Sequence, residues 1–434
     1  MMKIGILVND RGINNMDLSY PSDGNPGVGG TLYCFVSLIY HLLRGYDYDI
    51  TTFHYEESNI LPQGCLSVII SSPYDSIAET QKRNLSFLIH EQMYGYSNWY
   101  HEIEKNDVDT ILWAHNYLFR DELIQVPLCQ NVKRVVFVGR EEYDYYMDHD
   151  VSKKSVYIYN ICEDKKLCSQ MRDKNYGPIV TYVGSLVKVK GFHLLAKEWK
   201  KILHEVPEAQ LEVIGSGKLY DRSQKLGAYG IADEAYESEF MRYLTNRDGE
   251  LLNSVHFEGL VGTEKNEIFS KTYVGVVNPS AKSETFCLSA VEMEMAGIPV
   301  VTCGKHGLLD TVSHGESGLL FQTRRQMRRN IVKLLKNSEL RQELGNGARQ
   351  FVQNKFGVSE LIQKWNQLFE DIFAQNEPQF LKPQGNWTND LKWLRYLNRH
   401  MRKRMHWVPA ICKMRRDLFY IAGVLLKREK WKQV

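Results

Sequence analysis

The stretch from Asn278 to Glu292 carries two glutamates at a spacing that could serve a ligand with hydroxyl groups. It follows an apolar run at 275–277. Glu284 falls in the loop or first turn after that run, and Glu292 falls two turns into an apolar helix. The amides at the start of such a helix, together with its dipole, favour a bound phosphate, and each carboxylate can accept hydrogen bonds from sugar hydroxyls. For this spacing taken alone, an ordinary amphipathic helix with glutamates on its wet face is the commoner explanation.

A cation and a series of glycine-containing loops elsewhere in the chain favour the ligand site over the ordinary amphipathic helix. Another apolar run ends at Val183, and Lys190 stands at the head of the helix that follows it. An ammonium there can neutralise a diphosphate, and hydrogen bonds to charged groups contribute about 1.5–3 kcal/mol each. Further motifs follow in order: Gly215-Ser216-Gly217, residues 256–261, Gly297-Ile298-Pro299 and residues 315–320.

This ordered series resembles the second domain of GT-B retaining glycosyltransferases of family four, the sucrose-synthase-like or glycosyl transferases group 1 family. The resemblance covers 178–365 well. It is weaker but colinear over 1–165, where three motifs carry it: Gly27-Val28-Gly29-Gly30, Ala114-His115-Asn116 and Ile158-Tyr159-Asn160. The resemblance implies an α/β GT-B architecture, in which two Rossmann-like domains with parallel sheets face each other across a cleft.

The resemblance also implies roles for particular residues in a site for a nucleotide diphosphate sugar. Glu284 would hold hydroxyls of the donor sugar, Lys190 would stabilise the departing diphosphate, and His115 would line the cleft near the far hydroxyls of the sugar. Glu292 would hold the ribose. The other donor-binding candidates are the amides of Thr285, Phe286, Cys287 and Leu288, the backbone near Val261, the small residues Gly29 and Gly30, which admit close contacts, and the cation of Lys188.

Three departures from the family pattern concern the donor and the level of activity more than the fold. Ser185 stands where an arginine is usual, and Lys188 is expected to supply the missing cation. Thr285 and Cys287 replace glycines in the phosphate loop. A Pro-Glu pair of the family appears here as Leu309-Asp310.

Several weaker signals indicate no separate chemistry. Asp-x-Asp occurs at 47–49, 107–109 and 148–150, and three copies in an acidic body indicate chance, so no metal and no cofactor beyond the donor is expected. Gly215-Ser216-Gly217 lacks the third glycine of a dinucleotide fingerprint. From its residue type alone, His115 is equally well explained as a satisfied core histidine.

Strands and helices that would position these residues alternate along the chain. The first half has apolar runs typical of strands at 4–8, 50–54, 67–71, 110–114, 135–138 and 156–159. The second half begins again after Pro178, with strands expected at 179–183, 209–214, 255–257, 275–277 and 299–302. Helical patterns between them, such as 31–44 and 192–204, predict parallel sheets covered by helices. We therefore expect an acceptor-side domain over 1–170 and a donor-side domain over 178–370.

The overall composition is that of a globular protein. The chain has 434 residues, 43% of them apolar and 24% charged, which excludes a wholly disordered or fibrous chain. Eight scattered cysteines without a C-x-x-C pair predict reduced thiols in a cytoplasmic protein. The N-terminus shows no signal-peptide pattern, and the longest late apolar run, 418–426, is shorter than the roughly 20 residues that cross a bilayer.

Residues 385–434, the C-terminal extension, carry 13 Lys and Arg against three acidic residues, although the whole chain has a net charge of only +2. They also hold four of the eight tryptophans. Two helices are expected, separated by Pro409. Tryptophans and cations around an apolar strip are typical of membrane-surface segments, and each cation near anionic lipid adds about 1 kcal/mol. Peripheral contact with an anionic membrane is therefore expected; a solvated, partly packed extension is the alternative. Nucleic-acid binding is disfavoured because no such motif accompanies the basic residues.

These observations predict an enzyme: a retaining, metal-independent glycosyltransferase on the inner face of the cell membrane. It would move a sugar from a nucleotide diphosphate sugar to a glycan or lipid-linked acceptor in cell-surface polysaccharide synthesis. Two alternatives stay open, a GT-B-fold nucleotide-sugar epimerase and a non-catalytic nucleotide-sugar-binding protein.

Overall fold

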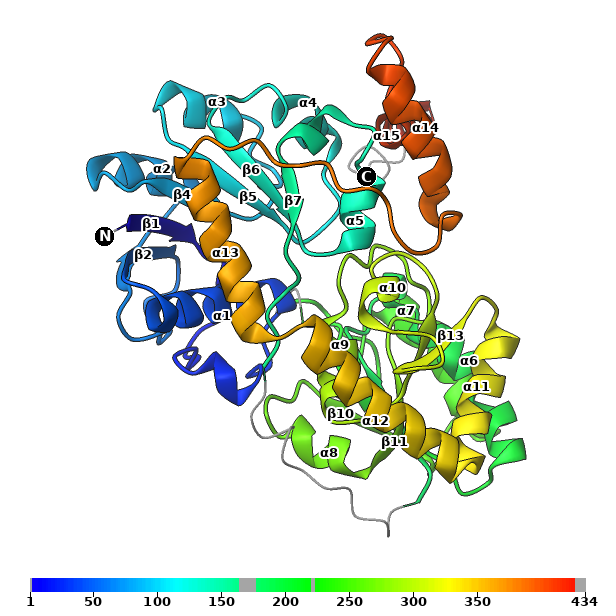
Figure 1. The fold of residues 1–434 in the computed structure, drawn as a ribbon. Coiled ribbons are helices and arrows are strands. Elements are labelled where there is room, and N and C mark those ends of the chain that lie inside the picture. Colours follow the sequence, from blue (N-terminus) through cyan, green and yellow to red (C-terminus); the bar gives the residue numbers. More distant parts are fainter. Residues whose placement is uncertain (1, 164–176, 220–222, 426–434) are drawn as a thin grey trace.

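Two parallel sheets, one in each half of the chain, form the framework of the molecule (Figure 1). The structure is a computed structural model that describes residues 2–163, 177–219 and 223–425. The junction between the two expected domains, 171–177, lies almost wholly outside these ranges, as does the part of the C-terminal extension beyond 425. Helices cover both sheets, so the predicted pair of α/β domains is confirmed.

The first sheet has seven strands in the order β3-β2-β1-β4-β5-β6-β7, and all neighbouring strands pair in parallel. Its strands are β1 (Met2–Leu7), β2 (Tyr48–His54), β3 (Leu66–Ile69), β4 (Phe87–His90), β5 (Thr110–Ala114), β6 (Val132–Phe137) and β7 (Ser155–Tyr157). Its helices are α1 (Gly30–Gly45), α2 (Pro73–Lys82), α3 (Trp99–Lys105), α4 (Arg120–Gln125) and α5 (Arg140–Tyr145). All six expected strands are present, and β4 adds one that the sequence pattern did not predict.

The second sheet has six parallel strands in the order β10-β9-β8-β11-β12-β13. Its strands are β8 (Ile179–Val183), β9 (Gln210–Ile214), β10 (Val255–Gly259), β11 (Thr272–Val276), β12 (Val300–Cys303) and β13 (Gly318–Phe321). The surrounding helices are α6 (Phe192–Glu205), α7 (Glu234–Leu244), α8 (Lys265–Lys271), α9 (Leu288–Met295), α10 (Leu308–Thr311) and α11 (Arg324–Lys336). Here the edge strand β13 is the one not predicted.

The chain returns to the first domain after the second sheet is complete (Figure 1). Helix α12 (Ser338–Lys355) packs against α9, and α13 (Val358–Phe373) then packs on the first sheet. The ring of Trp365 lies 4.8 Å from that of Trp113, and Phe369 lies 5.0 Å from Phe87. The second domain was expected to run to 370. In the structure, however, the apolar face of α13 is buried in the core of the first domain.

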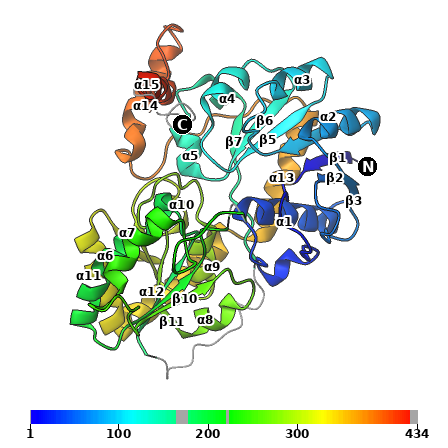
Figure 2. The ribbon, with the colours of Figure 1, turned by 180° about the vertical axis from the view of Figure 1, so that it is seen from behind.

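The C-terminal extension docks on the first domain beside α4 and α5 (Figure 2). The two expected helices are present as α14 (Lys392–Arg402) and α15 (Ile411–Leu425). Lys392 and Arg395 are buried against the body, although the cations of the extension were expected to lie near anionic lipid. None of the helices in the described residues is long and apolar enough to cross a bilayer.

Candidate functional site

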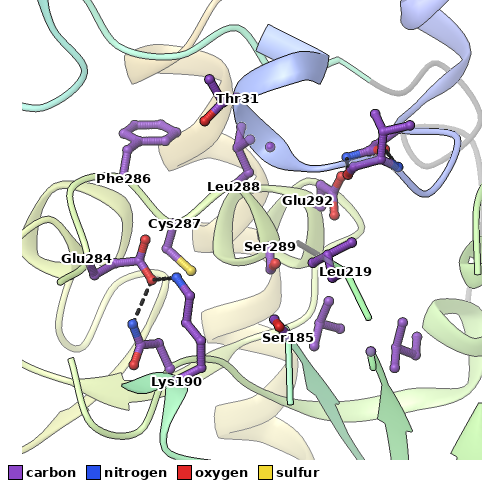
Figure 3. Close-up of a pocket in the computed structure, with 18 of the residues that line it drawn as sticks. Thr31, Ser185, Lys190, Leu219, Glu284, Phe286, Cys287, Leu288, Ser289 and Glu292 are labelled. Atoms are coloured by element: carbon purple, nitrogen blue, oxygen red, sulfur yellow. Dashed lines mark hydrogen bonds and ion pairs between the residues drawn. The ribbon is translucent and has the colours of Figure 1, made fainter. Parts of the chain in front are cut away.

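A cavity of about 470 Å3 lies between the two domains, at the carboxyl ends of strands in both sheets. The first domain contributes the loop before α1 and the residues that follow β5 and β7. The second domain contributes the ends of β8, β9 and β10 and the loop between β11 and α9 (Figure 3). This is the place where open α/β sheets bind ligands. The lining residues used below are Gly27, Gly30, Thr31, His115, Asn160, Ser185, Lys190, Val261, Lys265, Asn278, Glu284, Thr285, Phe286, Cys287, Leu288, Ser289 and Glu292.

Glu284 and Lys190 meet on one side of the cavity (Figure 3). The ammonium of Lys190 lies 2.8 Å from Oε2 of Glu284, and the amide of Asn278 donates to the same oxygen at 2.7 Å. Lys190 ends a short 3₁₀ turn before α6, and the following residue, Gly191, has φ +76°. A Cβ at Gly191 would lie 2.7 Å from the backbone nitrogen of Ser280, so glycine is what allows the two loops to approach.

Glu292 forms a second buried ion pair. Its Oε1 lies 2.7 Å from the ammonium of Lys265, the first residue of α8, and both side chains are more than nine-tenths buried. Breaking a buried pair of this kind is costly, because it leaves a charge without compensation. Lys265 therefore fixes the position of the Glu292 carboxylate in the cavity wall.

The start of α9, at Leu288 and Ser289, lies between the Lys190–Glu284 pair and Glu292 (Figure 3). Cys287 is the N-cap residue, and Leu288 and Ser289 follow in the first turn, whose amides an α-helix leaves without intrahelical partners. Burial raises the pKa of the Cys287 thiol, which favours its protonated form. The seven cysteines within the described ranges are all free thiols.

Thr285 and Leu288 bring the second domain against the first. The hydroxyl of Thr285 donates to the carbonyl oxygen of His115 at 2.6 Å. A Cβ at Gly30, the first residue of α1, would lie 2.9 Å from Cδ1 of Leu288. The start of α9 therefore approaches α1 as closely as a glycine at position 30 allows.

Two buried polar atoms of the first domain line the cavity without a partner. Nε2 of His115 and Oδ1 of Asn160 accept or donate no hydrogen bond within the described part of the chain. His115 lies against the rings of Phe35 and Trp113, and desolvation lowers its pKa to about 3, so the imidazole is neutral at physiological pH. Buried polar groups are normally satisfied, so both atoms are available to a ligand in the cavity.

Three of the site residues expected from the sequence lie outside the cavity lining or pack mainly against other side chains. Lys188 lies outside the cavity lining; its ammonium pairs with Glu239 at 2.6 Å and it is 70% exposed. Gly29 is the N-cap of α1 and also lies outside the lining. Phe286 touches the cavity but packs its ring against Tyr159 of the first domain.

Ser185, which stands where the family has an arginine, lies in the cavity wall. The backbone of Val261, the candidate contact for the nucleotide base, lies there too. Ser185 donates to the carbonyl of Ser216 at 3.3 Å. Val261 lines the cavity beside Gly27, whose hypothetical Cβ would lie 3.5 Å from the Val261 carbonyl oxygen. Within the described residues, Lys190 and Lys265 are the cations of the lining, so Lys265 and not Lys188 is the second ammonium there.

Sequence reasoning therefore missed Lys265 and gave Asn160 no role. Lys265 belongs to no motif, and only the tertiary position of α8, which contacts β8, brings it to Glu292. Asn160 stood inside a quoted motif, so its place after a strand end could have drawn attention to it. Together, the pairs Lys190–Glu284 and Lys265–Glu292, with a helix start between them, suit a ligand with an anionic middle and hydroxyl groups at both ends.

Comparison with known proteins agrees with this geometry. Residues 169–351 match the profile of the family described as glycosyl transferases group 1. An uncharacterized glycosyltransferase of Methanocaldococcus jannaschii is 23% identical over 267 residues, which are 58% of this chain and 62% of that protein. The capsular polysaccharide biosynthesis glycosyltransferase CapM of Staphylococcus aureus is 25% identical over 46% of this chain and 47% of CapM. The chain thus aligns with less than two thirds of each of these two curated relatives.

Solved structures share the fold over most of the chain. Sucrose-phosphate synthase from Thermosynechococcus elongatus superposes with a TM-score of 0.63 at 18% identity, over 86% of this chain and all of that chain. HepE of Anabaena, solved in complex with UDP and glucose, superposes with a TM-score of 0.64 at 14% identity over the same shares. The expected GT-B architecture is confirmed.

Proposed function

Since residues 169–351 match the glycosyl transferases group 1 family and the chain has a GT-B fold, we propose that the protein is a retaining glycosyltransferase. It moves a sugar from a nucleotide diphosphate sugar to the hydroxyl of a glycan or lipid-linked acceptor. The observation that carries the proposal is the pairing of Lys190 with Glu284 and of Lys265 with Glu292 on either side of the start of α9.

In this proposal the diphosphate lies at the start of α9 and against Lys190. As the bond from the anomeric carbon to the diphosphate oxygen breaks, negative charge grows on that oxygen, and the amides of 285–288 and the ammonium stabilise it there. Groups placed in advance where charge develops supply much of the rate enhancement of enzymes. Glu284 accepts hydrogen bonds from the hydroxyls of the transferred sugar, and Glu292 accepts them from the ribose.

The acceptor approaches from the first domain, where the neutral imidazole of His115 faces the sugar. The hydroxyl oxygen of the acceptor bonds to the anomeric carbon on the same face that the diphosphate leaves. The hydroxyl proton passes to the departing phosphate oxygen. Attack on that face retains the anomeric configuration. The buried, unpartnered Nε2 of His115 supports this placement.

The acceptor and the cellular setting are part of the same proposal. CapM is named for capsular polysaccharide biosynthesis, and a polysaccharide built on a lipid carrier at the inner face of the cell membrane would give the C-terminal extension a purpose. We assign the extension peripheral contact with that membrane.

A donor panel tests the proposal. UDP-, GDP-, TDP- and ADP-sugars are screened by thermal shift, because a ligand at 100 times its dissociation constant adds about 2.7 kcal/mol to stability. The donors that bind are then incubated with the protein and followed by NMR. We expect release of nucleotide and a free sugar that first appears in the anomeric configuration of the donor.

Two other results would contradict the proposal. Isomerised nucleotide sugar without release of nucleotide would identify an epimerase. Tight binding without turnover, with any donor and acceptor, would identify a non-catalytic binding protein, for which the loss of arginine at Ser185 would be the reason.

A further inference from the structure

The two helices of the C-terminal extension present apolar side chains to solvent. On α14 these are Trp393, Leu397 and Met401, and on α15 they are Met414, Leu418, Ile421 and Leu425. Met405 and Trp407 continue the surface between the helices, and Trp407 is 81% exposed. Residues three or four apart share one side of a helix, so each set forms a stripe. These nine side chains are called the apolar face.

The opposite side of α14 is held by charged groups. The ammonium of Lys392 lies 2.6 Å from Glu141 and 3.0 Å from Asp144, both on α5. The guanidinium of Arg395 donates to the carbonyl of Tyr145 at 3.0 Å, and both basic side chains are at most 2% exposed. Because breaking such buried pairs is costly, α14 cannot turn its apolar face inward.

Helix α15 is held by a partly exposed ion pair and a backbone hydrogen bond. The guanidinium of Arg120, at the start of α4, lies 3.0 Å from Asp417. The backbone amide of Ile411 donates to Asp148 at 2.7 Å, and Cys412 is buried beneath it. Leu418 and Leu425 consequently stay outside, 68% and 76% exposed.

This arrangement is the reverse of the one that a water-exposed helix adopts. A surface helix normally buries its apolar stripe and exposes its charges, and contiguous exposed apolar patches mark interaction sites. Here buried ion pairs on α14, with a partly exposed ion pair and a backbone hydrogen bond on α15, hold the apolar face outward. The face is therefore built to be covered by something.

We propose that the apolar face inserts into the headgroup and acyl boundary of an anionic lipid bilayer, with apolar insertion supplying most of the affinity. The exposed cations Lys403, Arg404 and Arg415 border the face, and the sequence from 391 to 434 contains only two acidic residues, Asp417 and Glu429. Tryptophan and leucine beside lysine and arginine suit that boundary. Two copies of the face would bring their cations together, whereas an anionic membrane complements them.

The proposal deepens the proposed function and rests on it for the lipid-linked acceptor. The extension is carried by the first domain, which is the acceptor side (Figure 2). Arg120, which contacts α15, is five residues beyond His115 in the cavity wall. The apolar face is therefore carried by the domain that binds the acceptor in the proposed function.

The test uses the full chain and vesicles of phosphatidylcholine, alone or mixed equally with phosphatidylglycerol. L418S/I421S changes the apolar face, and K403Q/R404Q changes its charged border; all four side chains are exposed, so neither variant disturbs packing. We expect the wild type to sediment with both vesicles. L418S/I421S should lower the partition coefficient at least about tenfold on both kinds of vesicle, which is 1.4 kcal/mol. K403Q/R404Q should bind phosphatidylcholine vesicles like the wild type and lose only the extra binding that phosphatidylglycerol adds.

A second readout reports depth. Brominated acyl chains should quench part of the tryptophan fluorescence of the wild type, and W407F should lose part of that quenching. No sedimentation of the wild type, or unchanged sedimentation of L418S/I421S, would overturn the proposal. A dimer in solution that L418S/I421S abolishes would show instead that a second copy covers the face. None of these assays contains a nucleotide sugar, so membrane binding without transfer activity would contradict the proposed function alone.

Discussion

Lys190 serves two anions in the proposed reaction. In the structure it is bonded to Glu284, which also accepts a hydrogen bond from Asn278. A diphosphate that approaches Lys190 competes with Glu284 for the ammonium and frees carboxylate lone pairs for sugar hydroxyls. Binding of the diphosphate and recognition of the sugar are thereby coupled through one side chain.

Glu284→Gln should lower donor turnover at least about tenfold, or 1.4 kcal/mol, because the amide accepts weaker hydrogen bonds from the sugar and no longer balances Lys190. The measurement is kcat for nucleotide release. Glu239→Gln is the matched control, since Glu239 pairs with Lys188 outside the cavity, and it should keep the wild-type rate. Wild-type turnover in Glu284→Gln would remove Glu284 from the site.

Lys265→Met should act on binding more than on turnover. The ribose is held equally in the ground state and the transition state, and a loss of such uniform binding raises KM without lowering kcat. We expect a KM for the donor at least about tenfold higher, or 1.4 kcal/mol. Lys271→Met, on the same helix but paired with the exposed Glu267, is the control. A fall in kcat alone would contradict the assignment of Glu292 to the ribose.

Helix α4 carries a buried carboxyl group, that of Glu122. Glu122 accepts hydrogen bonds from the Tyr100 hydroxyl and the Phe119 amide, and desolvation raises its pKa to about 7 from an ordinary value of 4.5. A raised carboxyl pKa means that the folded state holds its proton while the unfolded state has lost it. Stability that is present below pH 4.5 is therefore lost as the pH rises towards 7, by about 3 kcal/mol.

Glu122→Gln removes this ionisation, so its stability relative to the wild type should grow by about 2–3 kcal/mol between pH 5 and pH 8. Urea unfolding at the two pH values measures the difference. The control variant Glu102→Gln, on the exposed side of α3, should change the free energy of unfolding by the same small amount at both pH values. Equal effects of Glu122→Gln at both pH values would show that Glu122 is ionised in the folded protein.

The elements differ in how far sequence could predict them. Long periodic segments such as α6 and strands with flanking loops such as β5 were expected within a few residues of their observed bounds. Strand β4 was not, because three apolar residues and a histidine, without alternation, indicate a buried strand no better than a helix segment. Its place between β1 and β5, buried on both faces, is what makes it a strand.

The two domains meet tightly around the residues that follow β6. The Glu141 amide donates to Oδ2 of Asp310 at 2.8 Å, and the Tyr159 hydroxyl donates to Oδ1 at 3.2 Å. Asp310, which stands where the family has glutamate, thus joins the domains instead of lining the cavity. With α13 returning to the first domain, this contact holds the two domains in the arrangement in which both ion pairs face one cavity.

Gly139→Ala should open the molecule. A Cβ at Gly139 would lie 2.8 Å from both Oδ2 of Asp310 and the carbonyl oxygen of Thr285, and the backbone carbonyl can withdraw only if the domains separate. We expect a larger radius of gyration by small-angle scattering and a kcat/KM at least about tenfold lower. Gly177→Ala, where a Cβ meets nothing within 4 Å, should change neither, and an unchanged radius in Gly139→Ala would contradict the role of this contact.

Local sequence determined the two α/β domains, the glutamate pair at the start of a helix and the cation at Lys190, because each depends on residue type and spacing within one segment. Tertiary structure alone decided that Lys265 holds Glu292, that Lys188 turns away to Glu239 and that the basic side of α14 is buried. Those outcomes depend on which distant carboxylate each ammonium meets. A free charge and a paired one look the same in a sequence, and burial separates them by several kcal/mol.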